Sequence, residues 1–406
     1  MSTAPVSTGV SRYLAAFSKL LHLLLGSALG VAIAQWVISA SKPPYMGSAL
    51  LAVLWLGAAL LGALLIHEGG HWLGSRYAGL QCLAVAVLWL HLERPGTHWQ
   101  LRLKKRRPGS LAHVTAIPRT FERLRQRMAL FIAAGPAASL VAGLPLLAVG
   151  WVLRQPYRGG VWPGSTGGYL GAELLFLVGV GSVFTGLLNL LPFATAQGTL
   201  SDGERLRRLR RPGPAADQEV NRWQLATLAY QGLRPRDWPI ELLTQLLTAQ
   251  QAPAQLCQAH LYAYAHHLDH ADIGAARYHL HEAYAGCSAS SPAQRRHLTC
   301  ELAYLDVVHN NLPARAAQWY REAEQLLPFK QNEARFIQAL VACDTGDWAA
   351  ARQHLQVCEL EMQKVAQAGL RAQALDRLQE LHTLIQQRSK AVEEEASQRP
   401  ATHANC

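Results

Sequence analysis

Four long apolar stretches in the first half of the chain constrain its fold more than any other feature. They comprise residues 14–40, 47–73, 128–153 and 169–191. A helix needs about 20 predominantly apolar residues to cross a bilayer, and each stretch provides them. The first run follows Arg12 but is too long for a cleaved signal peptide. We therefore expect an α-helical polytopic membrane protein with four spans.

The positions of the lysines and arginines predict how these spans are oriented. Ten of them lie between Arg94 and Arg127, after the second apolar stretch, whereas the other two loops carry only Lys42, Arg154 and Arg158. Short, positively charged loops remain in the cytosol, so both termini of a four-span chain are predicted to be cytosolic, at the cell membrane if the organism is prokaryotic. These flanking positions account for the net charge of +11. The lipid bilayer is therefore an expected partner, and nucleic acid is not.

The basic segment contains a pattern typical of β-strands. Trp99, Leu101 and Leu103 alternate with polar residues, and the turn signal Pro95-Gly96 links them back to residues 82–92. We expect a small β-hairpin at the membrane surface. Two interpretations stay open: a packed hairpin, or an exposed edge strand that an unwound substrate extends by main-chain hydrogen bonds.

The second half of the chain is polar and patterned like a soluble all-α domain. We place a linker at 212–214, a cytosolic helical domain at 215–390 and a disordered tail at 391–406. Small residues recur at positions 276, 316 and 351, near the ~34-residue period of tetratricopeptide-like helix pairs. A generic array of helical hairpins remains the alternative, and either array predicts a protein partner. The seven scattered cysteines indicate neither a disulfide framework nor a cysteine zinc site.

A pattern of ionisable residues lies within the second apolar stretch, at His67-Glu68-Gly69-Gly70-His71. It fits H-E-x-x-H, whose i, i+4 spacing puts both imidazoles on one face of a helix, where they can bind one zinc ion with Glu68 as general base. Ionisable side chains in an apolar span cost about 2.5 kcal/mol or more each, which argues against a chance match. Gly69 and Gly70 predict that another segment approaches the helix closely.

The depth of the motif can be estimated from helix geometry. At ~1.5 Å per residue, the distance from Gly47 to His67 is about 30 Å, which places the histidines near the cytosolic edge of the bilayer. The same count from Tyr169 brings Asn189 to that edge, because the fourth stretch runs parallel to the second. The residues that follow Asn189 are therefore able to meet the histidines.

Asn189-Leu-Leu-Pro192 and a loop that ends in Asp202-Gly203 follow the fourth stretch. Together with the H-E-x-x-H pattern they resemble the site-2 protease family of intramembrane zinc metalloproteases, which pairs that motif with N-x-x-P…D-G on a later span. The resemblance implies that His67, His71 and Asp202 bind one Zn²⁺ per chain. It also implies that Glu68 is the general base and that Asn189 contacts the substrate or transition state.

A third motif of the same family lies on the intervening stretch. Gly135-Pro136 is similar to the family's G-P-x-x-N segment, with Ser139 where asparagine is common. The resemblance covers residues 47–203, and we expect residues 47–211 to form a membrane-embedded zinc protease core. Residues 1–46 provide the first span and its loop.

Other interpretations of single residues remain. Ser201-Asp202-Gly203-Glu204 has the S-x-x-E form of a helix capping box, so Asp202 has a structural alternative. Glu173 lies within the fourth apolar stretch and is expected to pack in the helix bundle or to meet water. His22, in the first stretch, is expected to be a hydrogen-bonded helix-packing residue. We expect His91, His98 and His113 to be surface histidines.

The leading hypothesis is an intramembrane zinc metalloendopeptidase that hydrolyses a membrane-spanning protein near its cytosolic end. A prenyl-protein-processing protease takes its third ligand from an E-x-x-x-D helix, but Leu177 stands four residues after Glu173, so that pattern fails. The alternative from another class is a non-catalytic, zinc-containing membrane scaffold that acts through its helical-repeat domain. The substrate and any regulator are not identified by the sequence.

Overall fold

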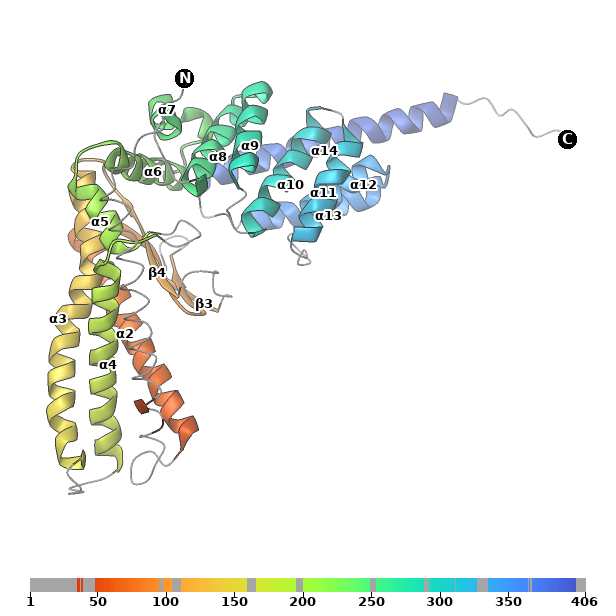
Figure 1. The fold of residues 1–406 in the computed structure, drawn as a ribbon. Coiled ribbons are helices and arrows are strands. Elements are labelled where there is room, and N and C mark those ends of the chain that lie inside the picture. The colour runs from red at the N-terminus through yellow and green to blue at the C-terminus, as the bar shows by residue number, and fades with distance from the viewer. Residues whose placement is uncertain are drawn as a thin grey trace. The chain divides into compact units, whose positions relative to one another are not determined.

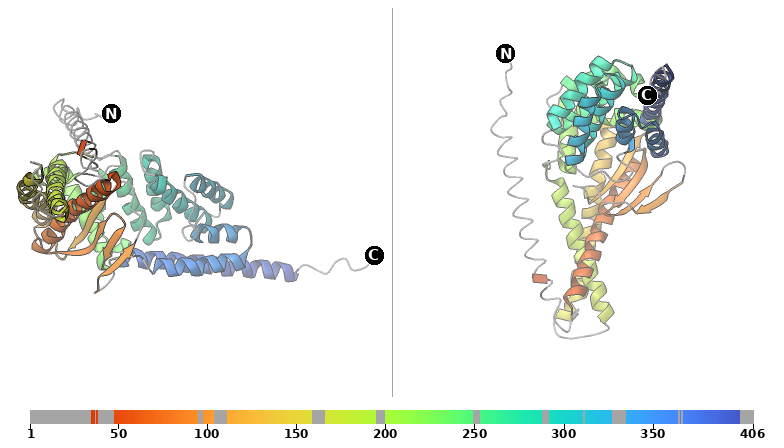
Figure 2. Two further views of the ribbon diagram at one scale, coloured as in Figure 1. Left: turned by 90° about the horizontal axis from the view of Figure 1, so that it is seen from below. Right: turned by 90° about the vertical axis from the view of Figure 1, so that its right-hand side faces the viewer.

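A computed structural model describes most of the chain in two compact units, Met1–Val220 and Asn221–Cys406 (Figures 1 and 2). The described residues are 35–36, 38, 48–94, 98–103, 111–158, 166–194, 200–248, 253–287, 292–310, 312–326, 335–363, 365 and 367–398. The expected first span, 14–40, lies outside them except for three helical residues, Gln35, Trp36 and Ile38.

Three long helices dominate the first unit and pack side by side (Figure 1). They are α2 (Ala49–Tyr77), α3 (Leu124–Arg158) and α4 (Thr166–Leu190). All three are long and apolar enough to cross a membrane, and many of their leucines and valines are exposed, such as Leu54, Val141 and Leu187. An apolar surface of this kind suits lipid. The first unit is therefore that of a membrane protein, with three of the four expected spans described.

Small residues allow these helices to approach closely. Cβ atoms built on Gly150 and Gly179 would overlap the backbone of the facing helix at Phe176 and Leu147. Close backbone contact at small residues is the usual way in which helices associate within a bilayer. The α3–α4 contact therefore has little tolerance for larger side chains at these glycines.

A four-stranded antiparallel sheet, in the order β3-β2-β1-β4, follows α2 and packs against its end. The strands are β1 (Leu80–Val87), β2 (Leu90–Glu93), β3 (Gln100–Leu103) and β4 (Ala112–Pro118). We expected a two-stranded hairpin, but the sheet has four strands. Residues 82–92 form two strands joined by a turn at Leu88, whose φ is 55°, and β4 is the fourth strand. All four residues of the edge strand β3 are exposed, which leaves both interpretations of the hairpin open.

A short helix, α5 (Asp202–Arg210), follows α4 and packs against α3 and α4. It is tied to α3 by Arg125, whose Nε donates to the Leu209 carbonyl at 2.5 Å. The next helix, α6 (Pro214–Gln231), begins within the expected linker 212–214. Proline suits this first position because its missing N–H has no partner within the helix anyway.

The second unit is helical and arranged largely in antiparallel pairs (Figure 2). Its elements are η1 (Pro235–Asp237), α7 (Ile240–Thr248), α8 (Pro253–Asp269), α9 (Ile273–Gly286), α10 (Pro292–Val308), α11 (Pro313–Leu326), α12 (Arg335–Asp344), α13 (Trp348–Met362) and α14 (Ala368–Gln398). The recurring small residues Ala276, Ala316 and Ala351 are buried, each on the second helix of a contacting pair.

The C-terminal helix α14 extends further than the sequence indicated. It continues to Gln398, past Ala391, where we expected a disordered tail to begin. Alanine and glutamate are strong helix formers, and they fill residues 391–396 apart from Val392, which explains the extension. Residues 399–406 lie outside the described part of the chain.

Candidate metal centre

The last turns of α2 carry His67, Glu68 and His71, all of them buried. The helical spacing puts the two imidazoles in edge contact, with ring centroids 4.9 Å apart. Burial of three ionisable groups in an apolar helix is costly unless partners compensate it. The partners come from α3 and α5.

Asp202 is the first residue of α5, and the local sequence explains how it is held. Ser201 is the N-cap, and its Oγ accepts the Glu204 N–H at 3.1 Å and donates to the Leu191 carbonyl at 2.7 Å. The Glu204 carboxylate pairs with Arg207 instead of returning to the cap. Ser201 therefore performs the capping that we considered for Asp202, and the Asp202 carboxylate remains available for the histidines.

The histidines and Asp202 converge on one point. Oδ2 of Asp202 lies 3.3 Å from Nε2 of His67 and 3.3 Å from Nε2 of His71. Among the described residues, these three form the group of His, Cys, Asp and Glu side chains whose ligand atoms could hold a metal ion. Two atoms that each lie about 2.0–2.1 Å from a tetrahedral zinc ion are about 3.3–3.4 Å apart, so the spacing fits zinc.

The outer nitrogens of both imidazoles have their own partners. Nδ1 of His71 donates to the Phe131 carbonyl at 3.0 Å, and Nδ1 of His67 lies 3.0 Å from Oγ of the buried Ser139. With its proton on Nδ1, a neutral His71 presents the lone pair of Nε2 to a carboxylate oxygen. Two acceptors face each other stably only if a positive charge lies between them.

A second proton on His71 is one way to supply that charge. Hydrogen bonds between charged nitrogen and oxygen are usually about 2.7–2.9 Å long, and the observed 3.3 Å is longer. The donor set of two imidazoles and a carboxylate is one that zinc prefers.

Two glycines shape the space around these side chains. A Cβ on Gly135 of α3 would overlap the imidazole of His71, and a Cβ on Gly70 would overlap the Ala134 carbonyl. Gly70 therefore permits the close approach that we expected at this motif. Nothing lies within 4 Å of a Cβ on Gly69, so the same expectation was wrong for that residue.

Glu68 is buried beside the histidines, and its Oε2 has no hydrogen-bond partner among the described residues. A buried carboxylate oxygen without a partner is costly in a structure maintained only for stability. The geometry therefore leaves Glu68 able to accept a proton from a group that enters the site.

Asn189, the other predicted catalytic residue, lies near the end of α4. Its Nδ2 donates to the Thr185 carbonyl of its own helix at 3.2 Å. The following turn is packed against α5, since a Cβ on Gly203 would overlap the Leu190 carbonyl. The role of Asn189 at the centre stays a prediction.

Glu173, the rival ligand, lies elsewhere in the unit. It is buried against Arg154, with 3.6 Å between Oε1 of Glu173 and Nη1 of Arg154, and it accepts the Trp36 indole N–H at 2.6 Å.

Among the predicted surface histidines His98 is exposed, but His91 is buried, with its Nδ1 3.7 Å from Oε1 of Glu93. That expectation was wrong for His91. His22 lies outside the described residues.

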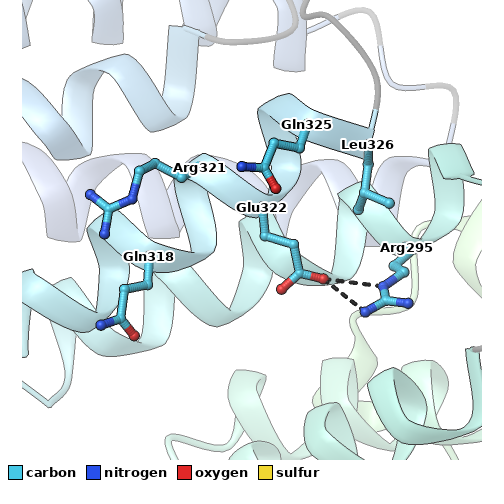
Figure 3. Close-up of a pocket in the computed structure, with 6 residues that line it drawn as sticks. All are labelled: Arg295, Gln318, Arg321, Glu322, Gln325 and Leu326. Atoms are coloured by element: carbon cyan, nitrogen blue, oxygen red, sulfur yellow. Dashed lines mark hydrogen bonds and ion pairs between the residues drawn. The ribbon is translucent and has the colours of Figure 1, made fainter.

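A pocket of about 580 Å³ lies in the second unit, on α10 and α11 (Figure 3). It is lined by Arg295, Gln318, Arg321, Glu322, Gln325 and Leu326, and Arg295 forms an ion pair with Glu322. None of the predicted site residues lines it. Five of its six lining residues are polar or charged, whereas small-molecule sites are usually lined mostly by apolar residues.

Three contacts of the centre were missed by sequence reasoning. The sequence indicates Ser139 only as a replacement for asparagine, and it connects neither the Phe131 carbonyl nor the close approach of Gly135 with a histidine. The G-P-x-x-S spacing on the intervening stretch was the available signal.

No family model, curated protein or solved structure matches the chain.

Proposed function

We propose that the chain is an intramembrane zinc metalloendopeptidase of the site-2 protease type. His67, His71 and Asp202 would hold the zinc ion, and Glu68 would be the general base. The observation that carries the proposal is the convergence of two Nε2 atoms on one carboxylate oxygen, at 3.3 Å each, while the structure assigns the proton of His71 to Nδ1.

Bound zinc supplies Lewis acidity, which polarises a peptide carbonyl and lowers the pKa of water toward ~7. Glu68 accepts a proton from the attacking water, whose oxygen bonds to the carbonyl carbon. When the C–N bond breaks, Glu68 returns that proton to the leaving amine. The products are a carboxylate and an amine, and the net reaction consumes one water molecule.

The substrate class follows from where the centre lies on its helix. His67 and His71 are in the last part of α2, a helix of 29 residues that is long enough to cross the bilayer. We place this end at the cytosolic face, with both termini in the cytosol, on the strength of the basic segment between Arg94 and Arg127. The substrate would be a membrane-spanning protein cut near its cytosolic end.

The local packing offers a way to admit an unwound segment. A helical peptide bond is shielded by its own hydrogen bonds, so the substrate must unwind before it reaches Glu68. Pro136 lies within α3, next to Gly135, and removes one main-chain hydrogen bond from that helix. Irregular backbone is tolerated at membrane depth where it lines a site enclosed by protein.

Glu68→Gln tests the proposal against a matched control. The variant keeps the size and polarity of the side chain but removes the base, whereas Glu122→Gln changes an exposed glutamate before α3. With a co-expressed single-span candidate substrate, wild type and Glu122→Gln should cleave it and Glu68→Gln should not. Cleavage by Glu68→Gln would show the mechanism to be wrong. Bound zinc without any cleavage by wild type would favour the scaffold alternative.

A further inference from the structure

The end of the membrane bundle that holds the metal centre also carries a group of arginines that the proposed function does not use. They come from two segments far apart in the sequence, residues 119–127 before and within the start of α3 and residues 205–211 on and just after α5. Arg125 joins the two segments, because its Nε donates to the Leu209 carbonyl, and α5 packs against α3 (Figure 1). The two basic segments therefore lie together.

Part of this positive charge is compensated within the first unit. On α5, Arg205 forms an ion pair with Glu219 at 2.8 Å. Arg207 and Arg208 both pair with the buried carboxylate of Glu204, at 2.7 and 2.8 Å. These contacts account for the arginines in the middle of α5.

The other arginines of the two segments are directed to the exterior. Four of them are exposed and form no ion pair with a described residue, and we call these four the arginine surface: Arg119, Arg123, Arg210 and Arg211. Between residues 119 and 127 the sequence contains one acidic residue, Glu122. The first turn of α3 has none, although a carboxylate there would offset the positive end of the helix dipole. The arginine surface therefore has an excess of exposed positive charge.

The arginine surface lies at the depth where the spans leave the bilayer. The candidate span on α3 begins at Leu124, immediately after Arg123. Arg127 donates through Nε to the carbonyl of Ala78 at 2.6 Å, just beyond the end of α2, so α2 ends at the depth where α3 begins. Tyr77, the last residue of α2, is 84% exposed, and tyrosine is enriched at membrane–water interfaces. The exposed guanidinium groups are therefore within reach of lipid headgroups.

The chemistry of these groups selects the headgroup that they fit. The planar N–H donors of arginine match the geometry of phosphate oxygens. The bilayer holds phospholipid phosphates at this depth, whereas other anions must come from solution. Basic clusters next to membrane spans attract lipids with a net negative charge, and zwitterionic lipids lack that charge.

We propose that the arginine surface binds the headgroups of anionic phospholipids. Binding would anchor the start of α3 and the end of α5 to the same lipid layer. The proposal goes beyond the proposed protease function and shares no residue with the metal centre. It requires only that α2, α3 and α4 span the bilayer.

The test uses the full chain in a neutral detergent, with mixed micelles of phosphatidylglycerol and phosphatidylcholine. Native mass spectrometry counts the lipids that stay bound, and wild type should retain phosphatidylglycerol in preference. Arg119→Gln with Arg210→Gln changes one arginine in each segment and should lower this preference at least fivefold, because each arginine near the membrane surface adds to the attraction. The matched control, Arg321→Gln with Arg352→Gln, removes the same charge at exposed positions of the second unit and should keep the preference.

Further measurements separate a lipid surface from a folding defect and from a site for free phosphate. Arg119→Lys with Arg210→Lys keeps the charge and should retain the preference for phosphatidylglycerol. Millimolar inorganic phosphate should leave the bound phosphatidylglycerol in place, and its release would assign the arginine surface to free phosphate and overturn the proposal. Equal preference in the glutamine variant at 119 and 210 and in the matched control would overturn it as well.

Discussion

Gly135 of α3 faces the imidazole of His71 so closely that a Cβ at position 135 would overlap the ring. The space that the glycine leaves empty is what allows His71 to lie with Nδ1 on the Phe131 carbonyl and Nε2 toward Asp202. Gly135 therefore determines the position of a predicted zinc ligand although it has no side chain of its own.

Gly135→Ala should displace His71 and lower the zinc content of the purified protein. Gly69→Ala is the matched control, because it adds the same methyl group on α2 where nothing lies within 4 Å. Metal analysis of the two variants checks the prediction. Full zinc content in Gly135→Ala would contradict the packing described for His71.

Ser139→Ala should weaken zinc binding by about 10–100-fold, the range typical for loss of a hydrogen bond that orients a metal ligand. Its Oγ lies 3.0 Å from Nδ1 of His67. Ser182→Ala removes another fully buried serine hydroxyl, one without a hydrogen-bond partner among the described residues. Competition with a zinc chelator should distinguish the variants, and equal affinities would remove Ser139 from the centre.

Asp202 and Ser201 should have separable roles. Asp202→Asn should lose bound zinc, because the amide is a poor ligand and carries no charge. Ser201→Ala should keep zinc-binding stoichiometry but lower the free energy of unfolding by about 1 kcal/mol, the usual cost of a lost N-cap. Zinc content and thermal melting measure the two effects. Unchanged zinc content in Asp202→Asn would show that Asp202 is not the third ligand.

Glu173→Ala should destabilise the protein without altering its zinc content. Removing one partner of a buried ion pair typically costs about 3–5 kcal/mol, because the other charge stays buried. Arg154 is the charge left behind, and it also packs over the Phe176 ring at 3.3 Å. The double variant Arg154→Met, Glu173→Met should melt at a higher temperature than Glu173→Ala, because it leaves no unpaired charge. A lower melting temperature in the double variant would contradict the cost assigned to the unpaired Arg154.

The membrane helices and the motif on α2 were predictable from the sequence because their signals are local. Hydropathy placed α2, α3 and α4 to within about five residues of the observed ends, and the i, i+4 spacing placed His67 and His71 on one face. Asp202 came only from the family resemblance. Its approach to the histidines depends on how α5 packs against α3 and α4.

The remaining features depend on contacts between distant residues, which a single sequence does not encode locally. The turn at Leu88 uses a left-handed conformation without glycine, so it divides β1 from β2 without a signal. The contacts of Ser139 with His67 and of Gly135 with His71 arise only when α3 lies against α2.

The most direct measurement of the central claim compares membrane-protein fragments released in cells that express wild type, Glu68→Gln or Glu122→Gln. Quantitative proteomics should find cytosolic fragments of membrane-spanning proteins with wild type and with Glu122→Gln. The same fragments should be absent with Glu68→Gln, at equal protein levels and equal zinc content. Identical fragments in all three strains would contradict the account of Glu68 as the base of an intramembrane protease.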